Sequence, residues 1–168
     1  MERVSPENWI IDWERMKRPG NIEMQFTLNV TYQTNIEMFP LFQEYFRAYQ
    51  PPAQLSAFYG KHFVMAGPDG SEIFKNDARF LRWLKHVHDF NVETGLKTMN
   101  VQKVTSTEIS QNLMMARVNW GAIYEKTGNE IIKVDIHYTL EHFKTDLKIL
   151  LVVSDEDQGK LMKEKGLL

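Results

Sequence analysis

The stretch "IIKVDIHYTL", residues 131–140, alternates apolar and polar side chains from Ile132 onward. Successive residues of a β-strand point to opposite sides of a sheet, so this period of two predicts a strand with one buried face and one polar face. The apolar face carries Ile132, Val134, Ile136, Tyr138 and Leu140. The polar face includes Asp135 and His137, which are either a catalytic pair or the hydrated side of a sheet.

A second strand, predicted over residues 113–125, is joined to this one by "EKTGN", residues 125–129. Gly128 stands where a three-residue hairpin loop needs a left-handed residue. This loop sets a register that places Asn119 opposite Asp135, Arg117 opposite His137, and Trp120 opposite Val134. The hairpin therefore predicts a polar quartet on one face and an aromatic and aliphatic surface on the other.

The rest of the chain predicts an α+β protein. Apolar spacings of three and four predict helices over residues 36–49 and 76–90, and a short helix is expected near residues 53–60. We expect Asn76 to cap the helix over 76–90 and Ser154 to cap a last helix. Strands are predicted over 22–32, 95–109 and 147–153, with a short hairpin in "HFVMAGPDGSEIF", residues 62–74. A further helix is predicted after Ser5.

Composition excludes several classes of protein. The chain has 168 residues, which suits one domain, and it has no cysteine, so disulfides, thiolate zinc sites and cysteine nucleophiles are excluded. A formal net charge of −2 argues against a nucleic-acid partner. No apolar run approaches the ~20 residues that a membrane span needs, and no secretory signal is visible. We therefore expect a cytoplasmic protein with no membrane partner.

The element order and three segments resemble the nuclear transport factor 2-like superfamily, also called SnoaL-like or cystatin-like. The segments are "LFQEYFRAYQ" (41–50), "LSAFYGKHFVMAGPDG" (55–70) and "YTLEHFKTDLKILLVV" (138–153). The resemblance covers about residues 35–154 of a single domain spanning 1–168, with residues 1–32 as an N-terminal extension. It implies a strongly curved antiparallel sheet wrapped around N-terminal helices, which leaves a conical cavity. It also implies a homodimer that forms through the outer face of the sheet.

One branch of this superfamily can be compared residue by residue. Steroid-isomerase-like members carry a general-base Asp directly before the Pro of the early hairpin, and Gly67 holds that position here. Their tyrosine donor on the first helix would fall near Gln43. These departures argue against steroid-isomerase chemistry in this chain.

Asp135 and His137 are the candidate catalytic residues. They share one face of a strand, and a carboxylate beside an imidazole can orient it for acid–base catalysis. The alternative is an ordinary polar surface in which Arg117, Asn119, Asp135 and His137 pair across strands, and this alternative is favoured.

His86 and His88 are two apart on a predicted helix and so face different ways, so we expect no metal site. No cofactor motif is present either.

The candidate ligand-binding residues are aromatic side chains and one methionine: Tyr59, Phe63, Trp83, Met99, Trp120 and Tyr138. Aromatic stripes more often form ordinary core, yet amphipathic Trp and Tyr at a cavity suit an apolar molecule with one polar group.

Three hypotheses follow. The favoured one is a non-catalytic protein that binds a small hydrophobic molecule in an apolar cavity. The second is a cofactor-independent, SnoaL-like isomerase, cyclase or dehydratase that acts on a hydrophobic carbonyl compound through Asp135 and His137. The third is an association module whose sheet surface binds a partner.

Overall fold

The computed structural model describes residues 44–45, 52–143, 146–154 and 156–168. Several predictions fall outside the described residues: the helix after Ser5, the strand over 22–32, Gln43, and the helix over 36–49 except Glu44 and Tyr45, which are helical.

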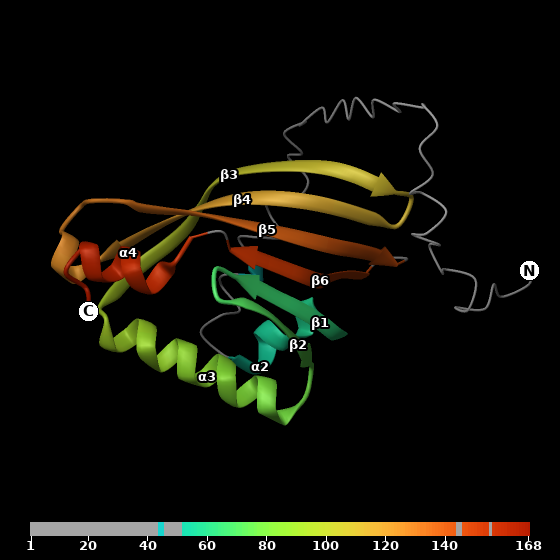
Figure 1. The fold of residues 1–168 in the computed structure, drawn as a ribbon, viewed down its shortest axis with the longest axis horizontal. Coiled ribbons are helices and arrows are strands. Elements are labelled where there is room, and N and C mark those ends of the chain that lie inside the picture. Colours follow the sequence, from blue (N-terminus) through green and yellow to red (C-terminus); the bar gives the residue numbers. More distant parts are fainter. Residues whose placement is uncertain (1–43, 46–51, 144–145, 155) are drawn as a thin grey trace, which may run out of the picture.

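The described chain forms one six-stranded sheet in the order β2-β1-β6-β5-β4-β3 (Figure 1). The strands are β1 (Tyr59–Gly67), β2 (Gly70–Lys75), β3 (Leu96–Ser110), β4 (Leu113–Tyr124), β5 (Ile132–Phe143) and β6 (Asp146–Ser154). Strands β3 to β6 form an antiparallel meander, and β1 joins it by pairing in parallel with β6. The sheet is therefore mixed, with a single parallel pair among the described strands.

The predicted register of the β4–β5 hairpin is confirmed. Arg117 pairs with His137, Asn119 with Asp135, and Trp120 with Val134. Gly128 adopts a φ of 64°, a conformation that costs a glycine little because it lacks a Cβ atom. A single helical turn, η4 (Glu125–Thr127), precedes this glycine and completes the loop.

Within residues 52–168, apart from the undescribed positions, three α-helices accompany the sheet: α2 (Pro52–Leu55), α3 (Ala78–Glu93) and α4 (Gln158–Glu164). The short helix predicted near 53–60 ends earlier, because a 3₁₀ turn, η3 (Ser56–Phe58), follows α2 and Tyr59 already begins β1.

The prediction that Asn76 caps α3 is wrong by one residue. The Asp77 carboxylate accepts hydrogen bonds from the backbone N–H groups of Arg79 (2.8 Å) and Phe80 (3.4 Å). Asn76 instead donates from its side-chain amide to the carbonyls of Ser56 (2.8 Å) and Tyr59 (3.2 Å). Asp77 therefore caps α3, while the Asn76 amide ties the start of the helix to the residues where β1 begins.

The predicted cap of the last helix is also displaced. Ser154 ends β6, and Asp157 caps α4 by accepting a hydrogen bond from the backbone N–H of Lys160 (2.9 Å).

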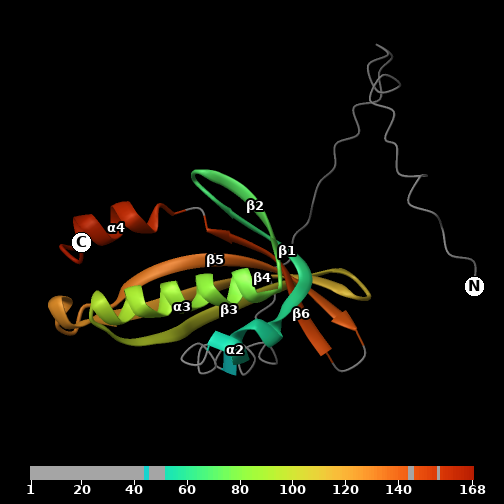
Figure 2. The same ribbon diagram turned by 90° about the horizontal axis from the view of Figure 1, so that it is seen from below.

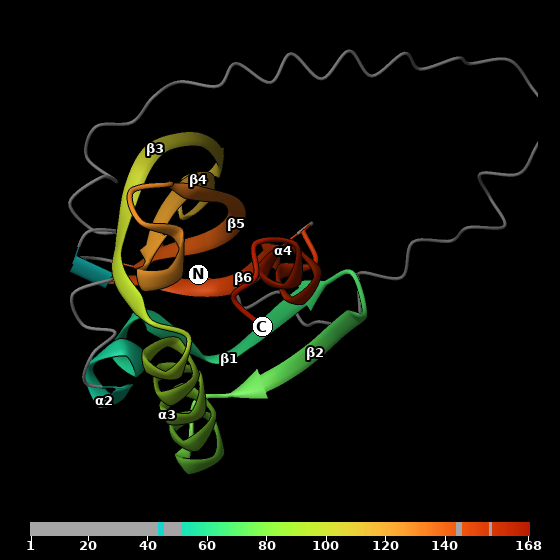
Figure 3. The same cartoon turned by 90° about the vertical axis from the view of Figure 1, so that its left-hand side faces the viewer.

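Helix α3 lies along one face of the curved sheet (Figures 2 and 3). Its Phe80 and Leu84 are almost fully buried and belong to the main core cluster with Phe63, Val118 and Trp120. The face of β4 and β5 that carries Trp120 and Tyr138 is thus the inner face of the sheet. The observed fold is α+β, as predicted, with a curved sheet and helices on its inner side.

No helix within the described ranges is both long and apolar enough to cross a lipid bilayer.

A candidate ligand-binding pocket

A pocket of about 480 Å³ lies between the inner face of the sheet and helix α3. Strand β5 contributes Ile132, Val134, Ile136 and Tyr138, which share one side of the strand. Helix α3 contributes Trp83 and Val87 from the opposite wall. The volume falls within the range of roughly 300–1,000 Å³ that is usual for small-molecule sites.

The described residues in the wall of this pocket carry no formal charge. None of its lining residues, among those that the structure describes, is Asp, Glu, Lys, Arg or His. The polar groups are the hydroxyls of four tyrosines and one serine, the Trp120 indole N–H, and the side-chain amides of Asn91 and Gln158. The pocket is therefore an apolar space with a few neutral hydrogen-bonding groups.

Four of these polar groups form a tyrosine cluster, which we define as Tyr45, Tyr59, Trp120 and Tyr138. The hydroxyls of Tyr45 and Tyr59 are 2.6 Å apart, and the Trp120 indole N–H donates to the Tyr138 hydroxyl at 3.2 Å. The Tyr45 ring centroid lies 6.2 Å from that of Trp120 and 6.3 Å from that of Tyr138. Residues from one helix and three strands thus meet at one part of the wall.

Two buried tyrosines of the pocket, Tyr124 and Tyr138, are held in the protonated form. Burial, and then the proximity of Tyr45, raises the pKa of Tyr138 well above its ordinary value. Burial also raises the pKa of Tyr124, another lining residue. Both phenols are therefore neutral at physiological pH, and they can donate a hydrogen bond without carrying charge.

The structure brings five of the six predicted ligand-binding residues to the pocket wall: Tyr59, Trp83, Met99, Trp120 and Tyr138. The sixth, Phe63, lies behind the wall. It is 2% exposed, and its ring centroid lies 4.6 Å from that of Tyr59 and 4.7 Å from that of Phe80. Phe63 therefore supports the pocket by packing against a lining residue.

Trp83 differs from the other aromatic residues of the wall because it is 38% exposed. Its indole is held by Phe80 and Phe74, with ring centroids at 5.9 Å and 5.8 Å. One side of this ring thus reaches solvent while the residue also lines the pocket, which makes Trp83 accessible to substitution without opening the core.

The predicted catalytic pair lies on the other face of the sheet. Asp135 and His137 alternate with Val134, Ile136 and Tyr138 along β5, and these three side chains line the pocket. Since neighbouring residues of a strand point to opposite faces, Asp135 and His137 point away from it. Their catalytic role remains a prediction, and any such role would act on the outer face.

Asp135 is well paired on that outer face. Its Oδ2 accepts from the Arg117 guanidinium at 2.5 Å, and its Oδ1 accepts from the Asn119 amide at 2.8 Å. Partial burial of the carboxyl group opposes ionisation, but these hydrogen bonds and the nearby charge outweigh it, so the pKa of Asp135 is lowered. Three members of the cross-strand quartet expected from the sequence, Arg117, Asn119 and Asp135, are thus joined by hydrogen bonds, and the fourth, His137, lies opposite Arg117 in the sheet.

No cluster of three or more His, Asp or Glu residues suited to a metal ion occurs in the described part of the chain. His86 and His88 lie on α3 two residues apart, so they leave the helix in different directions.

Several lining residues were not predicted. Val134 and Ile136 share the strand face of Tyr138, so the alternation of β5 could have identified them. Leu161, Met162 and Leu167 also line the pocket, and they come from α4 and the residues after it. No local pattern reveals that this distant segment packs beside β5.

The pairing of Asp135 predicts a pH-dependent contribution to stability. Its pKa is lower in the folded chain than the ~3.9 of an unfolded Asp, so ionised Asp135 stabilises the fold above about pH 4. This contribution is lost as the pH falls through the lowered folded pKa. We expect Asp135→Asn to reduce the unfolding free energy at pH 7 by about 0.5–1 kcal/mol, because the pair is partly exposed.

Urea unfolding of both proteins between pH 7 and pH 2 tests this expectation. The difference should vanish at the acid end, and binding of a ligand in the pocket should be equal in both proteins. A stability difference that persists where Asp135 is protonated would contradict the assignment.

Residues 37–157 match the family model described as "NTF2-like protein (DUF6841)". No curated protein matches the sequence. Among solved structures, the chain resembles an NTF2-like protein with a cystatin-like fold from Novosphingobium aromaticivorans at 13% identity and a TM-score of 0.56, which covers 79% of this chain and 86% of that one.

Aln2 from a Streptomyces species is similar at 8% identity and a TM-score of 0.59, over 76% of this chain and 94% of that one. An NTF2-like protein of unknown function from Shewanella oneidensis is similar at 13% identity and a TM-score of 0.51, over 71% and 97%. At these identities the structures establish the fold alone. The family match, which covers more than half of the chain, identifies it as a member of the DUF6841 family of NTF2-like proteins.

Proposed function

We propose that this protein binds a neutral, mainly apolar small molecule in the pocket between the sheet and α3. The observation that carries this proposal is the absence of any charged residue among the described residues that line the pocket. A charged ligand would lose its hydration on entry and would meet no charged partner among them, which costs several kcal/mol. A neutral apolar ligand loses little and gains the hydrophobic contribution of its buried surface.

The same observation favours binding over acid–base catalysis. General-base catalysis needs a group that is unprotonated near neutral pH, usually a histidine or a carboxylate. The lining tyrosines with shifted pKa values, Tyr124 and Tyr138, are shifted upward and stay protonated. They can hold a ligand oxygen by donating a hydrogen bond, but they cannot remove a proton at neutral pH.

The tyrosine cluster supports a more specific ligand, one with a single neutral polar group. Tyr45, Tyr59, Trp120 and Tyr138 bring three hydroxyls and one indole N–H together in one part of an otherwise apolar wall, where Trp120 donates to Tyr138 and the hydroxyls of Tyr45 and Tyr59 share a hydrogen bond. A ketone or hydroxyl oxygen placed there would be hydrogen-bonded on burial, which offsets its loss of water.

Two fluorescent probes with the same ring skeleton test the charge requirement. N-phenylnaphthylamine is neutral, and anilinonaphthalene sulfonate adds one negative charge. We expect the neutral probe to bind at least about tenfold more tightly, which corresponds to about 1.4 kcal/mol or more. Fluorescence titration of the full chain measures both affinities. Equal binding of the two probes, or no binding of either, would refute the proposal.

A substitution at the exposed edge of the pocket tests whether the probe binds inside the pocket. Trp83→Ala removes a lining ring, so we expect about tenfold weaker binding of N-phenylnaphthylamine. The matched control is Val92→Ala, which alters a 65% exposed side chain of the same helix that is not part of the lining. An equal loss in both variants would mean that the probe binds elsewhere.

A second matched pair tests the role of the tyrosine cluster. Tetralone differs from tetralin by one carbonyl oxygen, so the ratio of their affinities isolates the interaction of that oxygen. We expect Tyr138→Phe to shift this ratio against tetralone by about tenfold, as expected for one lost hydrogen bond in a buried site. Calorimetry measures both affinities, with Tyr124→Phe as the control. An unchanged ratio in Tyr138→Phe would exclude the cluster as the polar subsite.

A further inference from the structure

We propose that Leu167 forms the end wall of the pocket and sets the maximum length of the ligand. This inference rests on the proposed binding function and adds to it a ligand class, namely elongated neutral molecules up to a defined length. Leu167 and the α4 residues Leu161 and Met162 all line the pocket. The part of the chain that carries them, residues 158–167, lies beyond the family-matched range of 37–157.

The pocket extends along strand β5. Tyr138 lines it at one place and Ile132 at another, six residues along the same strand. At about 3.3 Å per residue this separation is roughly 20 Å. Tyr138 belongs to the main core cluster together with Tyr59, whereas Ile132 belongs to a second cluster with Leu167, Ala122 and Tyr124. The two ends of the pocket therefore have different walls, the tyrosine cluster at one end and Leu167 at the other.

Backbone geometry directs Leu167 into this second cluster. Gly166 adopts a φ of 69°, and its N–H bonds the carbonyl of Lys163 at 3.0 Å. The N–H of Leu167 then bonds the carbonyl of Met162 at 2.9 Å. These two bonds form a Schellman motif, in which the residue after the left-handed glycine packs back on the helix. Leu167 is accordingly 3% exposed, while its neighbour Leu168 is 54% exposed.

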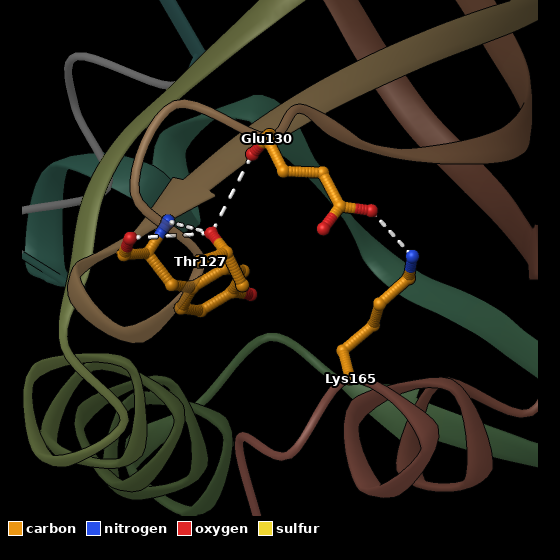
Figure 4. A network of polar contacts seen from close by, with 4 residues as sticks. Thr127, Glu130 and Lys165 are labelled. Carbon is orange, nitrogen blue, oxygen red and sulfur yellow. Dashed lines mark hydrogen bonds and ion pairs between the residues drawn. The ribbon is translucent and has the colours of Figure 1, made fainter.

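The β4–β5 loop holds the same segment in place (Figure 4). Lys165 reaches across to form an ion pair with Glu130, whose backbone carbonyl accepts a hydrogen bond from the Thr127 hydroxyl at 3.5 Å. Lys126 donates from its ammonium group to the carbonyl of Leu167 at 3.4 Å. The loop that sets the register of the hairpin therefore also fixes the end wall.

A series of straight-chain alcohols, from octanol to hexadecanol, tests the inference. Each is neutral, has one polar group and differs from the next only in length. Displacement of N-phenylnaphthylamine from the full chain measures each affinity. Affinity should rise about fourfold with each methylene while the pocket has room, because each buried methylene contributes a similar free energy. It should stop rising, or fall, at a cut-off length that Leu167 sets.

Two variants move the wall in opposite directions. Leu167→Ala should shift the cut-off to alcohols longer by two or more carbons, or remove it, and Leu167→Phe should shift it to shorter ones. Leu168→Ala, which changes the exposed neighbour, is the matched control and should leave the cut-off in place. Circular dichroism confirms that each variant is folded, and the two Leu167 variants test the wall independently if one is not.

The outcomes separate this inference from the proposed function. If no alcohol displaces the probe, the binding function itself is refuted along with the inference. If the alcohols bind without a cut-off, or with the same cut-off in the two Leu167 variants as in the native chain, Leu167 does not limit length while the binding function stands.

Discussion

The pairing of β4 with β5 is the constraint on which the remaining structure depends. In its observed register, Trp120 and Val134 face α3, while Asn119 and Asp135 face away. Side chains alternate along a strand, so a shift of one residue in β5 would exchange its two faces. Asp135 and His137 would then replace Val134, Ile136 and Tyr138 at the pocket. The Gly128 loop and the buried aromatic face of β4 together exclude that shift, because it would bury a carboxylate among apolar side chains.

This register separates two chemical environments by the thickness of one sheet. Charged and polar groups meet on the outer face, where Arg117 and Asn119 pair with Asp135. The inner face keeps neutral groups, with Tyr138 buried and protonated beside Trp120. Under the proposed function, a pocket built this way would select ligands by their lack of charge and would hydrogen-bond a polar atom without ionising it. A homodimer formed through the outer face, as the sequence predicts, would lie on the side of the sheet opposite the pocket and would add no residues to the pocket wall.

Much of the fold and part of the site could be predicted from local sequence patterns. Strand alternation and the Gly128 loop were enough to pair Trp120 with Val134. Aromatic character was enough to select four pocket residues, and Met99 was predicted with them. The sequence could not show that Phe63 lies outside the pocket lining, because its position behind Tyr59 depends on how β1 packs against α3. No feature of the sequence indicated that Leu167 lines the pocket. Its contact with Ile132 joins segments 35 residues apart through a helix cap, and no period or motif encodes that contact.

The proposed function requires that the space between the sheet and α3 admits a neutral small molecule. A crystal structure of the full chain with iodobenzene tests it most directly, since iodine is located by its anomalous scattering and apolar cavities take up small aromatic molecules. We expect an iodine peak inside the pocket, between Trp83, Met99 and Val134. Side chains that fill this space, or iodine found only on the outer surface of the protein, would contradict it.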